Sequence, residues 1–525
     1  MSTSSSGSGS AFRRFGIPLL VVMLAGIVIA ACWLAPGLPR DARNFYSFLA
    51  VDLALVLLNL WFIFLSGTRW YARTGIVVVE VIVLAILAPN MVFDGDMLPH
   101  LKNPFDRHYD DLEKQRSEQA NEIKAKPLEL TSTASDWPAF RGRNRDGVVS
   151  GPKLSRDWQV KPRQLWKQPC GAGWGSFAVA GNLLVTLEQR RDNEAIVGYE
   201  AETGKELWKY EYEAKFWEPL GGPGPRTTPT ISGGDVFSLG AEGHLVCVNA
   251  RTGDHKWTVN ILGDTPNLKW GMAGSPLVVD DKVIVNPGFQ GDSQAENRAV
   301  SAFDRKTGRL VWATASRKAG YSSPMLATID NVRQIILLDG NQLAGYDLAT
   351  GVMLWTYPWD ETNQDINVAQ PIVWEKEGKI FITSGYTIGC AMLHVWKSPE
   401  GWKVSELWKN VNKPLRCKMS SPIEYQGFLY GLDEGMLACI DAKNGKLKWK
   451  GDRFGHGQML RWEDLLILLA ENGDLVLFEL TPLEQRILGR VPAIKAPRNW
   501  NTPAIANGRI YVRNDKEMAC FDLRE

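Results

Sequence analysis

Apolar residues follow two different patterns along the chain, and the change between them divides it into two parts. Within residues 1–93, three long apolar runs stand close together, at Ile17–Leu34, Phe45–Leu65 and Ile76–Phe93. Each has roughly the 20 residues that a helix needs to cross a bilayer. The pattern predicts three transmembrane helices, followed by a polar linker at residues 94–135 that has many charges and no consistent apolar face.

Basic residues at the ends of these runs predict their orientation, because they concentrate on the cytoplasmic side of a membrane. On one side of the three runs lie Arg13, Arg14, Arg69 and Arg73, and on the other lie Arg40 and Arg43. The first group is larger. We therefore expect a multi-pass protein of the cytoplasmic (inner) membrane, with the rest of the chain on the outer, periplasmic side.

Two other interpretations of the apolar runs stay open. The first run could be a cleaved signal peptide, or Cys32 could be lipidated at a lipobox-like site, although two further runs make either device redundant. Asp52 and Glu80 lie inside the second and third runs, where an ionisable group is a candidate for ion or proton transport. Both are close enough to the end of a run for the side chain to reach the membrane interface.

From residue 136 onward, short apolar runs alternate with turn residues, and the chain repeats itself. The stretch "YEAETGKELW" recurs with changes, and shorter relatives lack its turn; the tryptophans that close these stretches are Trp166, Trp208, Trp257, Trp312, Trp355, Trp408 and Trp449. They are 41 to 55 residues apart, which is the length of one four-stranded propeller blade. Glycine accepts the positive φ of the tight turn, and a tryptophan can fill the gap between neighbouring blades.

A second repeated marker is a small or polar residue, then proline, then an aliphatic strand. It occurs at Thr228-Pro229, Ser275-Pro276, Ser323-Pro324, Gln370-Pro371, Ser421-Pro422 and Thr502-Pro503, with weaker versions at Ser176-Phe177 and Gln458-Met459. Proline is tolerated at the first residue of a strand, so the marker is expected to open the innermost strand of each blade. The count predicts eight blades.

The chain ends before a final tryptophan strand, and "RQLWK" around Trp166 can supply that strand from near the start of the repeats. Pairing the first strand with the last removes an exposed sheet edge. We therefore expect an all-β fold at residues 136–525, an eight-bladed β-propeller of four-stranded blades, preceded by about three transmembrane α-helices.

The repeats resemble the tryptophan-docking motif of the quinoprotein superfamily, which includes pyrroloquinoline quinone (PQQ) dehydrogenases and the outer-membrane assembly factor BamB. "DWPAFRGRNRDGVVSG", from Asp136, is similar to the segment that leads into the propeller in PQQ-like proteins. The resemblance covers about three-quarters of the chain. It implies the propeller fold, but a fold does not determine a function.

Departures from the dehydrogenase pattern separate the two functions that the resemblance implies. The chain has no adjacent cysteines and no C-x-x-C-H haem motif, and the family's calcium ligands and catalytic aspartate match no motif in it. We therefore expect a non-catalytic binding or scaffold module of the BamB-like kind, without a cofactor. The alternative is a PQQ-dependent dehydrogenase that uses calcium and passes electrons to membrane quinone.

Charge and cysteine content narrow the partners. With 59 basic and 58 acidic residues the net charge is +1, which argues against a nucleic-acid partner and favours a protein or polymer partner. Cys247, Cys439 and Cys520 occupy the same small-residue slot of the repeat and are expected to be free, buried thiols. The state of Cys170, Cys390 and Cys417 stays open.

Loops that enter the innermost strands converge on one face around the channel and are the expected binding site. The candidate binding residues are Trp174, Arg226, Trp270, Tyr321, Asn367, Arg416, Lys418, His456, Arg498 and Trp500. Aromatic residues mixed with Arg and Lys suit a protein segment or an anionic or aromatic ligand. Many such residues only pack or face water, and a lone histidine such as His456 is more often structural than catalytic.

Overall fold

The computed structural model describes residues 15–36, 38–101, 108–121, 130, 133–263, 265–288, 299–314, 318–359, 366–410, 414–495 and 498–525. The chain forms two compact units, Met1–Asp106 and Arg107–Glu525, and each is described by itself.

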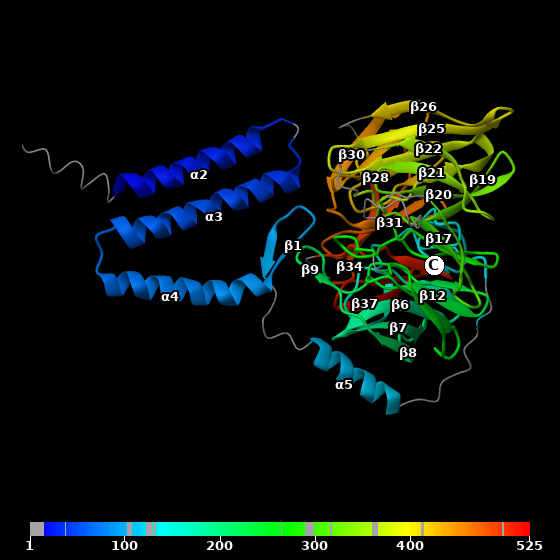
Figure 1. Ribbon diagram of the computed structural model, residues 1–525, viewed down its shortest axis with the longest axis horizontal. Coiled ribbons are helices and arrows are strands. Elements are labelled where there is room, and N and C mark those ends of the chain that lie inside the picture. The colour runs from blue at the N-terminus through cyan, green and yellow to red at the C-terminus, as the bar shows by residue number, and fades with distance from the viewer. Residues whose placement is uncertain are drawn as a thin grey trace, which may run out of the picture. The chain divides into compact units, whose positions relative to one another are not determined.

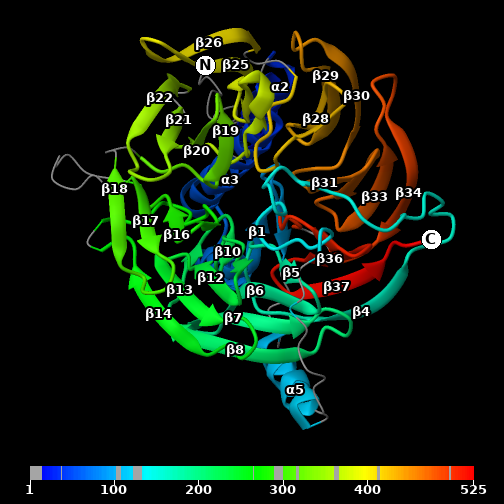
Figure 2. The ribbon, with the colours of Figure 1, turned by 90° about the vertical axis from the view of Figure 1, so that its right-hand side faces the viewer.

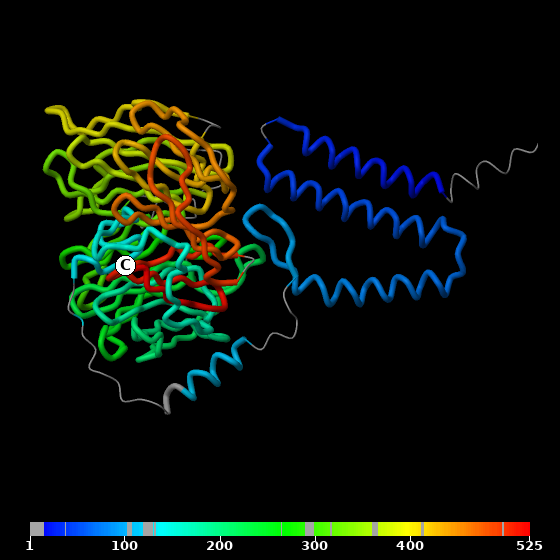
Figure 3. Tube along the Cα trace, turned by 180° about the vertical axis from the view of Figure 1, so that it is seen from behind, coloured from blue at the N-terminus to red at the C-terminus, as the bar shows by residue number. Residues whose placement is uncertain are grey.

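Three helices make up most of the first unit: α2 (Ile17–Leu34), α3 (Arg40–Leu65) and α4 (Trp70–Leu87), which follow one another as rods in the chain trace (Figure 3). All three are long and apolar enough to cross a membrane, with mean hydropathies of 2.7, 2.4 and 2.1. The third span ends earlier than predicted. Pro89 has no N–H to continue the helical ladder, so the chain passes through a 3₁₀ turn, η2 (Ala88–Asn90), into a hairpin of β1 (Met91–Phe93) and β2 (Pro99–Leu101).

Eight sheets arranged in a ring form the second unit, which confirms the predicted eight-bladed propeller (Figures 1 and 2). Blade 1 consists of β5 (Ala178–Ala180), β6 (Leu183–Arg190), β7 (Asn193–Glu200) and β8 (Glu206–Glu213), and blade 2 of β11 (Thr230–Ser232), β12 (Asp235–Leu239), β13 (His244–Asn249) and β14 (His255–Asn260). Blade 3 consists of β15 (Leu277–Val279), β16 (Lys282–Val285), β17 (Val300–Asp304) and β18 (Leu310–Thr314), and blade 4 of β19 (Met325–Ile329), β20 (Val332–Leu338), β21 (Gln342–Asp347) and β22 (Met353–Pro358). Blade 5 consists of β23 (Ile372–Trp374), β24 (Lys379–Ser384), β25 (Gly389–Ser398) and β26 (Gly401–Asn410), and blade 6 of β27 (Ile423–Tyr425), β28 (Phe428–Asp433), β29 (Met436–Asp441) and β30 (Leu447–Arg453). Blade 7 consists of β31 (Gln458–Trp462), β32 (Leu465–Leu469), β33 (Asp474–Glu479) and β34 (Arg486–Pro492), and blade 8 of β35 (Ala504–Ala506), β36 (Arg509–Arg513), β37 (Glu517–Asp522) and β4 (Arg163–Pro169).

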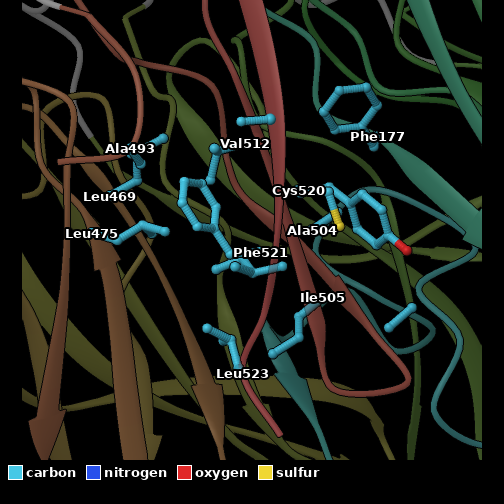
Figure 4. Packing of buried hydrophobic residues seen from close by; sticks show 14 of the residues in the cluster. Phe177, Leu469, Leu475, Ala493, Ala504, Ile505, Val512, Cys520, Phe521 and Leu523 are labelled. Carbon is cyan, nitrogen blue, oxygen red and sulfur yellow. The ribbon is translucent and has the colours of Figure 1, made fainter. Parts of the chain in front are cut away.

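The ring closes by pairing the two ends of the repeat region. Strand β4 pairs antiparallel with β37, with Trp166 opposite Cys520, so blade 8 takes its outermost strand from the start of the propeller (Figure 2). The largest apolar core lies at this junction. Figure 4 shows Cys520, Phe521 and Leu523 after the last turn of the chain, with Leu469 of blade 7 and Phe177 of blade 1 in the same buried cluster.

The polar residue of the proline marker joins each blade to the next. The backbone N–H of Ser176 donates to Thr228 Oγ1 at 2.9 Å, that of Thr228 to Ser275 Oγ, and that of Ser275 to Ser323 Oγ. Further hydrogen bonds join Ser323 to Gln370 and Gln370 to Ser421. Gln458 then bonds to Met419, Thr502 to Gln458, and Ser176 to Thr502, which completes the circle. A belt of hydrogen bonds therefore links all eight innermost strands around the channel.

Five tryptophans of the repeat pack on a glycine turn of the next blade, which explains the Thr-Gly pair. Gly351 has φ +75°, and a Cβ there would lie 2.4 Å from Cε3 of Trp312. Gly204, Gly253, Gly308 and Gly445 meet Trp166, Trp208, Trp257 and Trp408 in the same way. Trp166, Trp208, Trp257, Trp408 and Trp449 donate their indole N–H to a carbonyl of the next blade at 3.0–3.1 Å.

Two tryptophans depart from this hydrogen-bonding pattern. Trp355 donates to Gln334 Oε1 of its own blade at 2.6 Å, and the indole N–H of Trp312 has no acceptor among the described residues.

The small slot of the repeat lies directly opposite the tryptophan in the ladder, as at Cys247–Trp257 and Cys439–Trp449. All seven cysteines are free, and the six in the propeller are buried.

Helix α5 (His108–Asn121) lies in the region predicted as a linker and packs on the propeller where blades 8 and 1 meet. Arg116 donates to the carbonyl oxygen of Pro169 at 3.0 Å and forms an ion pair with Glu206 at 3.4 Å. Its guanidinium also lies 5.1 Å from the ring centre of Tyr199.

The segment of residues 136–149, here called the lead-in segment, crosses the channel. Trp137 forms an antiparallel bridge with Val179 of blade 1, and Ile231 of blade 2 donates its N–H to the Pro138 carbonyl at 2.8 Å. Strand β3 (Val148–Val149) adds to the inner edge of β31 as a fifth, parallel strand of blade 7. The lead-in segment therefore extends the sheet hydrogen bonding of three blades into the channel.

Two buried arginines fix the lead-in segment to three more blades, blades 3, 4 and 6. Arg145 is 2% exposed, and its terminal nitrogens donate to Thr230 Oγ1 and to the carbonyls of Ser275, Pro276 and Pro324. Arg141 is 1% exposed and donates to the carbonyl of Pro422 at 2.9 Å. Burial lowers the pKa of Arg145 to about 9 and that of Arg141 to about 10, still above neutral pH, so both stay charged.

Candidate functional site

Loops on one face of the ring surround a cavity of about 240 Å³, here called the aromatic cavity. Strands alternate in direction within a blade, so the loops that enter the innermost strands share this face with the loops between second and third strands. The lining residues are Phe140, Trp174, Glu218, Leu220, Gly221, Arg226, Trp270, Ala273, Tyr321, Ile366, Val368, Tyr386, Met419, Ser421, Gln458, Trp500 and Thr502. The cavity therefore draws on the lead-in segment and on loops of most blades.

Two tryptophans with an arginine stacked behind them form one wall of the aromatic cavity. The ring centres of Trp174 and Trp500 are 5.0 Å apart, and the Arg498 guanidinium lies 5.2 Å and 5.3 Å from them. Trp174 donates its indole N–H to the Gly221 carbonyl at 2.8 Å, and Trp500 donates to Glu471 Oε1 at 2.5 Å. These contacts hold the rings in place, because each is fixed by both stacking and a hydrogen bond.

A buried ion pair forms a second wall. Glu218 ends the first strand of the short hairpin of β9 (Trp217–Glu218) and β10 (Gly222–Pro223), and its Oε1 lies 3.1 Å from Nη2 of Arg226. Both oxygens of Glu218 also accept backbone N–H groups, those of Leu220 and Gly221. Burial lowers the pKa of Arg226 to about 10, which leaves the guanidinium charged at neutral pH.

Aromatic rings backed by lysines complete the rim. Trp270 and Tyr321 have ring centres 5.5 Å apart, and Lys269 Nζ lies 4.9 Å from the Trp270 ring centre. On another blade, Lys418 Nζ lies 4.8 Å from the ring centre of Tyr386. The rim therefore combines flat apolar surfaces with positive charge, which favours aromatic and anionic groups of a ligand.

Five of the ten predicted binding residues line the aromatic cavity together: Trp174, Arg226, Trp270, Tyr321 and Trp500. Arg498 and Lys418 lie behind it, each stacked on a lining ring.

The other three have structural contacts. Asn367 is fully buried and donates to the carbonyls of Asp339 and Gly340, Arg416 pairs with Asp433 at 2.8 Å, and the buried His456 donates its backbone N–H to Glu471 at 3.0 Å.

Sequence reasoning missed Phe140, Glu218 and Tyr386. Phe140 belongs to the lead-in segment, and no local pattern shows that this segment returns into the channel. The long Gly/Pro-rich insertion "WEPLGGPGPR" around Glu218 is the one visible signal, because it has no counterpart in the other repeats. Tyr386, with φ +55°, lies in a loop between second and third strands, whereas the predicted site comprises only the loops that enter the innermost strands.

The described residues contain no group of three or more His, Cys, Asp or Glu side chains that could hold a metal ion. Among the described residues, Glu218 is the one carboxylate that lines the aromatic cavity, and both of its oxygens already accept hydrogen bonds.

Fold and repeats together define the class: a β-propeller of eight quinoprotein-type blades preceded by apolar helices. The family described as "Outer membrane protein assembly factor BamB" matches residues 158–288 and 267–451, more than half of the chain. The chain belongs to this family.

Individual relatives include both assembly factors and enzymes. The chain is 22% identical over 362 residues to "Outer membrane protein assembly factor BamB" of Yersinia pestis, covering 57% of this chain and 84% of that protein. It is 25% identical over 248 residues to lupanine 17-hydroxylase [cytochrome c] of Pseudomonas sp, covering 44% of this chain and 33% of the enzyme. Quinohemoprotein alcohol dehydrogenase from Comamonas testosteroni has a similar structure, with a TM-score of 0.51, 12% identity and coverage of 78% of this chain and 84% of that one. That last similarity concerns the fold alone.

Proposed function

We propose that the chain is a membrane-anchored binding module that holds a segment of a partner protein in the aromatic cavity and performs no redox reaction. The observation that carries this proposal is the wall of Trp174, Arg498 and Trp500, in which two indoles and a guanidinium are fixed in one stack. Tryptophan, tyrosine and arginine dominate the binding energy of protein interfaces when they are held rigid. Membership of the BamB family supports a protein partner.

The alternative is a PQQ-dependent dehydrogenase, and lupanine 17-hydroxylase among the relatives favours it. PQQ with calcium needs several oxygen ligands at the site, and Asp or Glu carboxylates are the charged ones among them. Glu218, the one carboxylate among the described lining residues, is already engaged by Arg226, Leu220 and Gly221. The described residues therefore do not fit this cofactor pair, and we derive no reaction through it.

Reconstitution separates the two functions. The full chain in detergent is incubated with PQQ and calcium, and quinone absorbance and reduction of an artificial dye are recorded. We expect neither bound quinone nor dye reduction. A stoichiometric quinone spectrum with dye reduction in the presence of an alcohol or sugar would replace the binding proposal with the dehydrogenase.

For the membrane part, we propose a three-part division into residues 1–93, 94–135 and 136–525, with the propeller on the periplasmic side of the cytoplasmic membrane. Arg69, between α3 and α4, and Arg73, in the first turn of α4, support this orientation; Arg13 and Arg14 lie outside the described residues. A protease added to intact spheroplasts is expected to remove the propeller. Protection of the propeller would reverse the orientation.

A further inference from the structure

The innermost strand of each blade has one edge that faces the channel, and the lead-in segment shows how that edge can be used. A two-residue hairpin turn makes its flanking residues a hydrogen-bonded pair, so the residue before them points its N–H and C=O away from the partner strand. Val179, Ile231 and Arg461 stand at this position in blades 1, 2 and 7. All three donate their N–H to carbonyls of the lead-in segment, at 2.8 Å.

Two other blades fill the same edge with side chains. In blade 4 the N–H of Thr328 donates to Glu375 Oε1 at 2.8 Å. In blade 6 the carbonyl of Glu424 accepts from the Arg461 guanidinium. Filling this edge is therefore a general feature of the ring.

Blades 3 and 4 keep backbone groups at this edge that no described residue fills. Val278 is the equivalent position of blade 3, before the turn at Asp280 and Asp281, and its N–H and C=O point into the channel. Leu326 lies two residues before Thr328 and therefore faces the same way. Alternate residues of a strand point their backbone groups to the same side. Pro276 and Pro324 stand two residues before Val278 and Leu326, and their carbonyls accept from Arg145 in the channel, which supports this direction for Val278 and Leu326 as well.

A cavity of about 690 Å³, here called the edge cavity, lies against these two open edges. Three consecutive residues of β15 and four of β19 line it, from Leu277 to Val279 and from Met325 to Thr328. Successive side chains of a strand point to opposite faces, so consecutive residues can line one cavity only through the strand edge. The edge cavity is therefore shaped to receive another strand.

Exposure differs between the covered and the open halves of the channel. Val179 of blade 1, Met459 of blade 7 and Ile505 of blade 8 are fully buried. Val278 and Leu326 are half-buried, and so are Ile372, Val373 and Trp374 of blade 5 on the far side of the edge cavity. The lead-in segment thus covers one half of the ring and leaves apolar surface in the other.

Charge specifies what the edge cavity accepts. Its outer lining balances Arg143, Lys376 and Arg461 against Asp146, Glu375, Glu377 and Glu424. At its inner end stands Arg145, a buried guanidinium that bonds only to carbonyls and one hydroxyl and has no carboxylate within ion-pair distance among the described residues. A buried charge without a counter-charge attracts an anionic group.

We propose that the edge cavity is a second binding site, which takes an extended peptide segment of a partner protein by backbone pairing with β15 and β19. The peptide continues the pattern that β3 begins on β31. It carries apolar, β-branched residues against the half-buried strands and one carboxylate side chain toward Arg145. This mode of recognition uses main-chain hydrogen bonds for affinity and side-chain pockets for specificity.

Amide hydrogen exchange on the full chain in detergent micelles tests this proposal. The probe is acetyl-Val-Thr-Val-Glu-Val-amide at millimolar concentration. We expect exchange at Val278 and Leu326 to slow at least tenfold, with no change in the loops around the aromatic cavity. A matched probe with Gln in place of Glu is expected to bind at least fivefold more weakly. Equal binding of the two probes, or no slowing at these amides, would overturn the proposal.

Variants of the open edge give an independent check. Val278→Pro and Leu326→Pro each remove a channel-facing donor without removing a ladder bond to the neighbouring strand, and they are expected to abolish probe binding. Val278→Ala and Leu326→Met keep the donor and are expected to bind within twofold of the unchanged chain. Retention of binding by both folded proline variants would contradict backbone pairing. If they do not fold, the exchange pattern of the unchanged chain decides.

Discussion

The perimeter of the ring and its channel are built in opposite ways. On the perimeter the same contact recurs from blade to blade, a tryptophan on the Thr-Gly turn of the next blade, as for Trp208 on Gly253 and Trp257 on Gly308. In the channel the contacts with the lead-in segment differ between blades: Trp137 contacts blade 1, Pro138 blade 2, Arg145 blades 2 to 4, Arg141 blade 6 and β3 blade 7.

The perimeter contacts stabilise the ring, whereas the channel contacts distinguish this chain from other propellers of the same fold. A repeated contact can serve only packing, because it offers every blade the same surface. The stacked Trp174, Arg498 and Trp500 and the uncompensated Arg145 occur once each, and both stand in the channel. Specific binding is therefore expected in the channel, and tolerance of change is expected to follow the same division.

The largest expected effect comes from filling a perimeter contact. Gly351→Ala puts a Cβ within 2.4 Å of the Trp312 ring at φ +75°, and we expect it to cost about 3 kcal/mol of unfolding free energy from steric overlap and the left-handed backbone. Gly427→Ala is the matched control, because φ there is +80° and nothing lies within 4 Å of the added Cβ. It is expected to cost about 1 kcal/mol. Urea unfolding of the two variants measures both, and equal losses would refute tight docking.

A perimeter contact that is not repeated should make stability depend on pH. Glu194 of blade 1 accepts from Ala241 of blade 2 at 3.0 Å and from the Tyr212 hydroxyl at 2.7 Å, and burial raises its pKa from 4.5 to about 7. The folded chain keeps a proton that the unfolded chain releases. Its contribution is therefore complete below pH 4.5 and is lost as the pH rises through about 7, by at most about 3 kcal/mol.

Comparison of unfolding midpoints between pH 4.5 and 7.5 for the unchanged chain and Glu194→Gln isolates this contribution. The variant cannot titrate, so its stability is expected to fall less over this range. The same fall in both proteins would mean that Glu194 titrates normally in the fold.

Removing the lead-in segment's central anchor should have a smaller effect. Arg145→Met leaves the carbonyls of Ser275, Pro276 and Pro324 without their donor but also removes a buried charge, and we expect a net loss of about 2 kcal/mol. Arg143→Met changes an exposed residue of the same segment and is expected to cost less than about 0.5 kcal/mol. Thermal unfolding checks the pair, and a stabilised Arg145→Met variant would show that the charge serves binding alone.

The smallest effect on stability is expected at the aromatic cavity. Trp174→Leu removes one ring of the stack with Trp500 and Arg498, and we expect it to cost about 1 kcal/mol. The change in tryptophan fluorescence during urea unfolding measures this loss. A cost as large as that of Gly351→Ala would assign the stack to the framework of the ring.

Most of the fold was predictable because its signals are local and repeated. Tryptophan spacing and the proline marker gave the eight blades, and the missing last strand gave the pairing of β4 with β37. Strand partners could be assigned because each repeat carries the same pattern.

The channel was only partly predictable because its contacts are not local. Trp174 and Trp500 were found from their loops, but they are 326 residues apart, and only the closed ring brings them to 5.0 Å. Arg416 was expected at the site, but its partner is Asp433 of its own blade. No sequence pattern shows that Phe140 and Arg145 enter the channel, because the residues that surround Phe140 and the acceptors of Arg145 lie far away along the chain.

Photo-crosslinking in intact cells is the most direct measurement of the claim that binding resides in the channel and not on the perimeter. A photoreactive phenylalanine analogue is placed at Tyr321, on the rim of the aromatic cavity, or at Leu447, which is 46% exposed on the outermost strand of blade 6. We predict one discrete crosslinked partner from position 321 and none from position 447. A partner captured from position 447 and not from position 321 would contradict the account.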